Sequence, residues 1–74
     1  MKLRLHIEKD RNVSFFCEGW ADKVETDDAM KIKIPNAAVA QLILKRMPCK
    51  MMLPNQIVLD GNIRKVDEGQ CVFL

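Results

Sequence analysis

The sequence predicts a single α+β domain in which a small antiparallel sheet packs against one helix, with elements in the order β-β-β-α-β-β-β. Three observations lead to this prediction. Several short segments alternate apolar with polar residues, which is typical of strands with one buried face. One central segment, residues 37–47, lacks this alternation and is rich in helix-forming residues. The 74 residues suffice for one domain, so we assign residues 1–74 to it.

The first two strands are expected to pair as a hairpin. Lys2–Glu8 alternates leucine and isoleucine with charged residues and a histidine, so one of its faces should be buried. A polar turn at residues 9–12 separates it from Val13–Trp20, which is rich in β-branched and aromatic residues. Phe15 and Phe16 are adjacent and must point to opposite faces of this strand. One of them therefore covers a second layer or is free for a partner.

A third strand and the helix are expected next. After an acidic turn at residues 25–28, Met30–Ile34 alternates with two lysines that should face water. Asn36 can cap the first turn of a helix over Ala37–Met47, which ends because proline follows. Its apolar residues cover more than one stripe, so this helix should be buried on more than one side. The sheet can cover one side and a second copy of the chain the other.

Three strands are expected after the helix. Ile57–Leu59 leads into Asp60-Gly61, a dipeptide preferred in two-residue hairpin turns because it tolerates positive φ. Asn62–Val66 is then the return strand. A further turn at residues 67–70 leads to Cys71–Leu74, a final strand whose exposed edge could pair with another chain.

The few reactive residue types argue against an enzyme. The chain has one histidine, His6, and three widely spaced cysteines, Cys17, Cys49 and Cys71. An odd number at this spacing forms no complete disulfide framework and does not match the paired spacing of a zinc site. Cys17 could meet His6 across the first hairpin, but no third group is evident to orient such a pair. We therefore expect no catalytic residue, no bound metal and no cofactor.

The sequence also indicates where the protein resides. No apolar segment approaches the ~20 residues that cross a bilayer. Residues 1–10 alternate charged with aliphatic residues, whereas a signal peptide needs an unbroken apolar segment. We expect a cytoplasmic protein of bacterial or phage type, with no membrane partner.

Basic residues are concentrated in the middle of the chain. Residues 29–52 contain five basic residues and no acidic one, whereas the segments before and after carry net charges of −2 and −1. Such clustering can attract an acidic protein or phosphate groups, and it is also compatible with a solvated surface. Together with two possible aromatic anchors, these residues form the predicted binding surface. Its members are Lys31, Lys33, Lys45, Arg46, Lys50, Phe16 and Trp20.

These features favour a small non-enzymatic protein that regulates a protein partner by binding it. A chain of this size buries only about 60% of the surface that its unfolded form exposes, which also favours a homodimer. The basic residues would raise the association rate with an acidic partner more than the affinity. The alternative is an accessory protein that binds nucleic acid through phosphate contacts, although it has few aromatic residues on which bases could stack.

Two short parts of the sequence also resemble PilZ domains, which are β-barrel receptors for cyclic di-GMP. The resemblance is carried by Asn12-Val13-Ser14 with the later Gly19, and by residues 61–64 and 69–73. It implies a β-barrel and, as a third functional hypothesis, a receptor for a cyclic dinucleotide. Arg4 and Arg11 precede Asn12 but lack the spacing of that family's arginine pair, and the predicted helix would interrupt the barrel. No site residue is carried over from the family.

Overall fold

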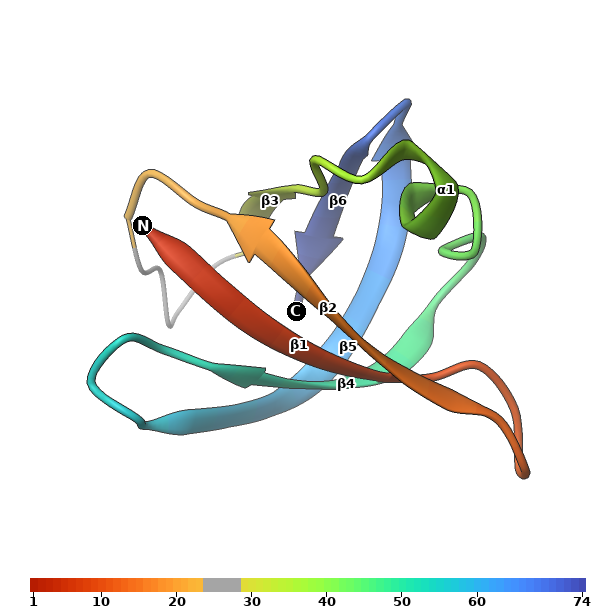
Figure 1. Ribbon diagram of the computed structural model, residues 1–74, viewed down its shortest axis with the longest axis horizontal. Coiled ribbons are helices and arrows are strands. Elements are labelled where there is room, and N and C mark those ends of the chain that lie inside the picture. Colours follow the sequence, from red (N-terminus) through yellow and green to blue (C-terminus); the bar gives the residue numbers. More distant parts are fainter. Residues whose placement is uncertain (24–28) are drawn as a thin grey trace.

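The structure is a computed structural model that describes residues 1–23 and 29–74. Its strands form one closed antiparallel barrel in the order β1-β2-β3-β6-β5-β4 (Figure 1). The elements are β1 (Lys2–Glu8), β2 (Ser14–Trp20), β3 (Met30–Lys33), α1 (Ala37–Ala40), β4 (Met47–Met52), β5 (Val58–Asp67) and β6 (Gln70–Phe73). The predicted α+β fold, a sheet packed against a helix, is therefore wrong. The predicted acidic turn at residues 25–28 lies outside the described residues.

The predicted helix ends after one turn. Asn36 caps α1 as expected, since the Val39 N–H donates to its side-chain oxygen over 3.2 Å. The chain then turns, and this connection places Ala40 and Ile43 in the core while Leu44 remains 62% exposed. Some apolar residues of this segment thus lie in the core, and others lie on the surface. They do not form one face of a longer helix.

Strand β4 differs from the prediction, which ends a helix before Pro48 and places no strand here. In β4, Met47, Cys49 and Met51 alternate inward with outward residues. The strand pairs with β1 on one side and β5 on the other. Pro48 is tolerated because Asn62, opposite it, exchanges its backbone hydrogen bonds with Leu74, while the β1–β4 pairing ends at Cys49.

The predicted hairpin turn at Asp60-Gly61 is also wrong. β5 continues through both residues, and Gly61 lies opposite Cys49 of β4. A Cβ atom on Gly61 would lie 2.4 Å from the Leu74 carbonyl oxygen and 2.8 Å from Cζ of Phe73. Glycine is required here because the last strand occupies the space of a side chain.

The core fills the barrel. Strand β1 matches its predicted bounds, and β2, β3 and β6 each lie within one residue of theirs. Their inward residues and those of β4 and β5 form one cluster, and it contains no polar or charged side chain among the described residues. The side chains with almost no exposure are Leu3, Leu5, Ile7, Met30, Ile32, Ile43, Met51, Ile63 and Cys71.

Among residues 1–23 and 29–74, no helix combines the length and the apolar character needed to span a bilayer. The helix α1 has four residues and lies next to the β5–β6 turn (Figure 1). Pro35, Gln41 and Gly69 are among the residues that line a small hollow there.

We predict that Gly61→Ala destabilises the barrel. The added methyl group has no space beside Phe73 and Leu74, and overpacking of this kind costs about 1–3 kcal/mol. Urea unfolding followed by circular dichroism measures the loss of unfolding free energy. Asp60→Ala, one residue away on the outer face of the same strand, is the control. A Gly61→Ala variant no less stable than this control would contradict the prediction.

Candidate binding surface

The five basic residues of the predicted surface are all exposed, but the barrel does not bring them together. Lys31 and Lys33 lie on β3, whereas Lys50 lies on β4. These two strands are separated by two strands in either direction around the barrel. Lys45 and Arg46 lie in the connection between α1 and β4. The basic segment is continuous in the sequence and divided in space.

Phe16, the first predicted apolar anchor, lies on the outer face of β2 and is 78% exposed. Its ring stacks on the His6 ring of β1, with 4.4 Å between the ring centroids and 15° between the ring planes. His6 lies opposite Phe16 on one side and opposite Lys50 on the other. One row of outward side chains thus runs across three strands, from an exposed aromatic ring to a cation.

A second row lies beside this one. Arg4 of β1 is opposite Met52 of β4, which is opposite Val58 of β5. Met52 and Val58 are exposed apolar side chains. The two rows line one shallow depression of about 260 Å³. We call its outward residues the outer strip: Arg4, His6, Phe16, Lys50, Met52 and Val58.

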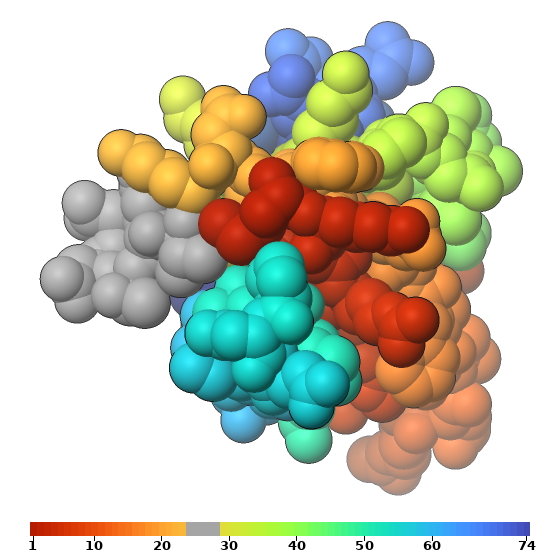
Figure 2. Space-filling model, turned by 60° about the vertical axis from the view of Figure 1, so that its left-hand side comes forward, coloured from red at the N-terminus to blue at the C-terminus, as the bar shows by residue number. Residues whose placement is uncertain are grey.

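The strands that carry the outer strip are neighbours on the molecular surface. Figure 2 shows β1 in red between β2 in orange and the segment around residues 50–57 in cyan. Of these residues, only Phe16 and Lys50 belong to the binding surface predicted from the sequence. The alternation of β1 together with the hairpin register could have placed His6 beside Phe16, but Met52 and Val58 required β4, which was not predicted.

Trp20, the second predicted anchor, is 50% exposed and lies on the same face of β2 as Phe16. It is opposite Lys2 of β1 and Lys33 of β3. Lys2 also forms an ion pair with Glu18 over 3.2 Å. Trp20 is therefore the register partner of Lys33, one of the five predicted basic residues. Phe16 lies in the same row as another of them, Lys50.

Strand β2 is fully paired on one side only. β1 pairs with all seven of its residues, whereas β3 pairs only through Trp20 and Lys33. Continuing that register would place Pro35 opposite Glu18, and proline has no N–H to donate. The inward residues Phe15 and Cys17 are only partly buried, unlike the fully buried inward residues of β1. The barrel is thus incompletely covered along this part of β2.

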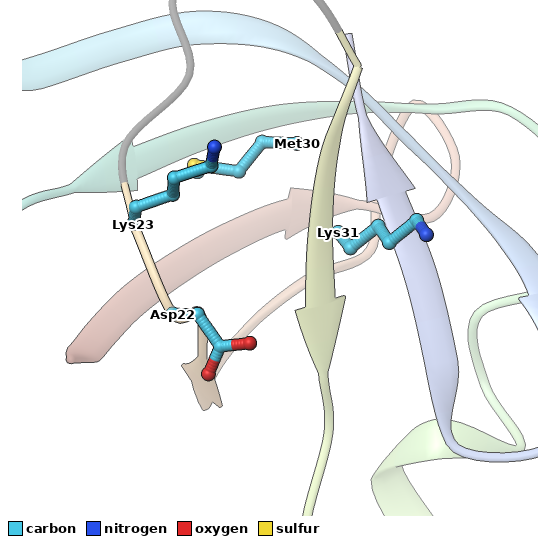
Figure 3. Close-up of a pocket in the computed structure, with 4 residues that line it drawn as sticks. All are labelled: Asp22, Lys23, Met30 and Lys31. Atoms are coloured by element: carbon cyan, nitrogen blue, oxygen red, sulfur yellow. The ribbon is translucent and has the colours of Figure 1, made fainter.

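Another hollow lies near the start of β3 (Figure 3). Its lining residues are Asp22, Lys23, Met30 and Lys31. In the close-up, the side chains of Lys23 and Met30 extend along each other, whereas the Asp22 carboxylate and the Lys31 ammonium group point away in different directions. The Asp22 and Lys31 groups drawn there therefore do not converge on one point.

The three cysteines are poor nucleophiles in this fold. Burial raises the pKa of Cys17 to about 11, with a further contribution from Cys71. Burial, followed by the effects of Cys17 and Cys71, raises the pKa of Cys49 to about 12. Burial also raises the pKa of Cys71, and nearby Lys65 opposes this shift. The reactive thiolate is therefore disfavoured at neutral pH.

Cys17 faces inward opposite Leu5, whereas His6 faces outward, so the contact left open by the sequence is not made. Across residues 1–23 and 29–74, no group of three or more histidine, cysteine, aspartate or glutamate residues is placed to hold a metal ion.

No family model, curated protein or solved structure matches the chain.

We predict that Cys49 makes stability fall at alkaline pH. Its pKa is raised from 9.0 to about 12 in the folded state, so the folded protein holds this proton more tightly than the unfolded chain. The stabilisation is fully present below about pH 9 and is lost as the pH rises towards 12. The free energy of unfolding is measured with reductant across this pH range for wild type and for Cys49→Ala. It should fall more steeply with pH in wild type, by up to about 1.4 kcal/mol per pH unit. Parallel slopes would show that the thiol does not contribute.

Proposed function

We propose that this protein is a small non-enzymatic binding module, acting in the cytoplasm, whose outer strip holds a protein partner and thereby regulates it. The observation that carries the proposal is Phe16, whose ring is 78% exposed and stacked on His6. Met52 and Val58 extend the exposed apolar area beside it. Exposed aromatic and aliphatic groups that gather in one depression are typical of interaction sites, where aromatic residues supply much of the affinity.

The outer strip carries two cations, and acidic residues lie opposite both of them. Arg4 and Lys50 lie within the strip and are exposed. Each has an acidic residue opposite it in a neighbouring strand, Glu18 for Arg4 and Asp60 for Lys50. The net field of the strip is therefore modest. We expect charge to affect the association rate and the choice of partner more than the strength of binding.

Binding of single-stranded nucleic acid is the second candidate, and Trp20 favours it. Its half-exposed ring lies between Lys2 and Lys33, an arrangement in which a base could stack while phosphates meet the cations. Trp20 is the only tryptophan of the chain, so its fluorescence reports directly on stacking. Saturable quenching by an oligonucleotide that weakens steeply with salt would favour this candidate. Unchanged fluorescence would favour the protein-binding proposal.

A receptor for a cyclic dinucleotide is the third candidate. The closed barrel is the kind of fold that the resemblance to PilZ domains implies. Arg4 lies on β1, and Arg11 precedes β2 in the turn after β1. Isothermal titration with cyclic di-GMP separates this candidate from the other two. Saturable heat would favour it, and the absence of heat at millimolar nucleotide would remove it.

We predict that Phe16→Ser abolishes partner capture. The immobilised chain is incubated with a bacterial lysate, and the retained proteins are quantified for wild type and variant. Because Phe16 is largely exposed, the substitution should leave the circular dichroism spectrum unchanged. Leu44→Ser, which also removes a largely exposed apolar side chain, is the matched control because Leu44 is not part of the outer strip. A protein retained by wild type and by the control, but not by Phe16→Ser, is the expected result. Equal retention by all three would contradict the proposal.

A further inference from the structure

We propose that two copies of this chain form a dimer by antiparallel pairing of residues 14–18 of β2. This inference deepens the proposed binding function, because it names a second copy as a partner of the strand that carries Phe16. It rests on three properties of β2. They are the direction of its backbone groups, the register that a twofold axis would impose, and the partly covered core beneath the strand.

The backbone hydrogen bonds at both ends of the first hairpin fix the direction of the β2 groups. The Ala21 N–H donates to the Met1 carbonyl over 3.0 Å, and the Lys9 N–H donates to the Val13 carbonyl over 2.9 Å. In an antiparallel pair such bonds recur at every second residue. The odd-numbered residues of β2 therefore direct their N–H and C=O groups towards β1, and the even-numbered residues direct theirs away from it.

Three even-numbered residues have no strand opposite them on that second side. Trp20 is paired with Lys33 of β3, whereas Ser14, Phe16 and Glu18 have no register partner there among the described residues. They therefore form a short free edge next to the single Trp20–Lys33 pair with β3. Unpaired N–H and C=O groups along a strand edge are a template for strand addition.

A second copy fits this edge because the edge is complementary to itself. With Phe16 on a twofold axis, antiparallel pairing places Phe16 opposite its copy and Ser14 opposite Glu18 of the other chain. All three facing pairs are of the type that exchanges two backbone hydrogen bonds. No like charges lie directly opposite each other, and two aromatic side chains face across the axis, which favours the pairing.

The outward rings would then form one continuous row. His6 stacks on Phe16 within each chain, so the row across the axis contains four rings in the order His6, Phe16, Phe16, His6. Strand pairing uses the edge of the sheet and leaves its outer face in place. The outer strip of each chain thus remains available to a protein partner, and the dimer carries it twice on one extended sheet.

The inward face of β2 gives the third argument. Phe15 and Cys17 point into the barrel but are only partly buried. A strand added along residues 14–18 places Phe15 of one chain opposite Cys17 of the other in the same register. It therefore adds apolar cover where the barrel is incomplete, and removal of that apolar surface from water stabilises the dimer.

Sedimentation equilibrium with a reversal of charge tests this interface. The wild-type chain is measured with reductant from micromolar to millimolar concentration and is expected to dimerise. Phe16→Lys and Phe16→Glu should each lose the dimer, because like charges would then face each other on the axis. An equimolar mixture of the two variants should recover it as a heterodimer. Leu44→Lys and Leu44→Glu are the matched controls and should dimerise like wild type.

Hydrogen exchange of the wild-type amides gives a second measurement that needs no substitution. The N–H groups of Phe16 and Glu18 should exchange more slowly as the protein concentration rises, whereas those of Phe15 and Cys17, which face β1, should be protected at every concentration. A chain that stays monomeric at millimolar concentration overturns the inference. So does a dimer that both Phe16 variants retain, or a mixture no more associated than either variant alone.

The two proposals can fail separately. A monomeric chain whose partner capture is still abolished by Phe16→Ser leaves the proposed binding function standing and removes the dimer. A dimer that responds to the charge reversal, but captures no protein through Phe16, leaves the interface standing and removes the partner.

Discussion

The structure depends on β4, which pairs with β1 on one side and with β5 on the other. This strand joins the hairpin of β1 and β2 to the hairpin of β5 and β6 and thereby closes the sheet into a barrel. Closure satisfies the backbone groups of strands that would otherwise end as edges. It also explains how a chain of this size encloses an entirely apolar core with so little helix. The alternating inward methionines and cysteine of β4 are the side chains that make this closure compact.

The same closure determines where recognition can occur. In the barrel order β6 lies between β3 and β5, so the terminal strand is not the free edge that the sequence suggested. Among the described residues, Ser14, Phe16 and Glu18 of β2 have no register partner on their second side, and there the ring of Phe16 is largely exposed. The candidate sites proposed for a partner are the outer strip, the surroundings of Trp20 and this part of β2. Each arises from the register of β2 with its neighbours.

Sequence reasoning located the strands whose alternation is regular and failed where two signals conflicted. Lys2–Glu8 and its neighbours could be predicted because inward and outward residues differ clearly in polarity. Residues 37–47 combine high helix propensity with apolar residues on all sides. From Met47 onward, however, the chain forms β4, so tertiary strand pairing outweighs the helix propensity. Asp60-Gly61 has the composition of a turn, but glycine is needed at position 61 because Phe73 leaves no space for a side chain. Phe16 could be recognised as exposed, whereas the separation of Lys31 from Lys50 follows from barrel closure, which no local pattern encodes.

The two inward glycines have a wider consequence. At Gly19, a methyl group would lie 2.7 Å from Cγ2 of Ile32, and at Gly61 the nearest atom is closer still. Larger barrels can enclose small molecules because their bore widens with the number of strands. At Gly19 the nearest atoms belong to side chains, whereas at Gly61 they include the backbone of Leu74. The space beside these two glycines is thus filled by the protein's own atoms and leaves no room there for a bound molecule.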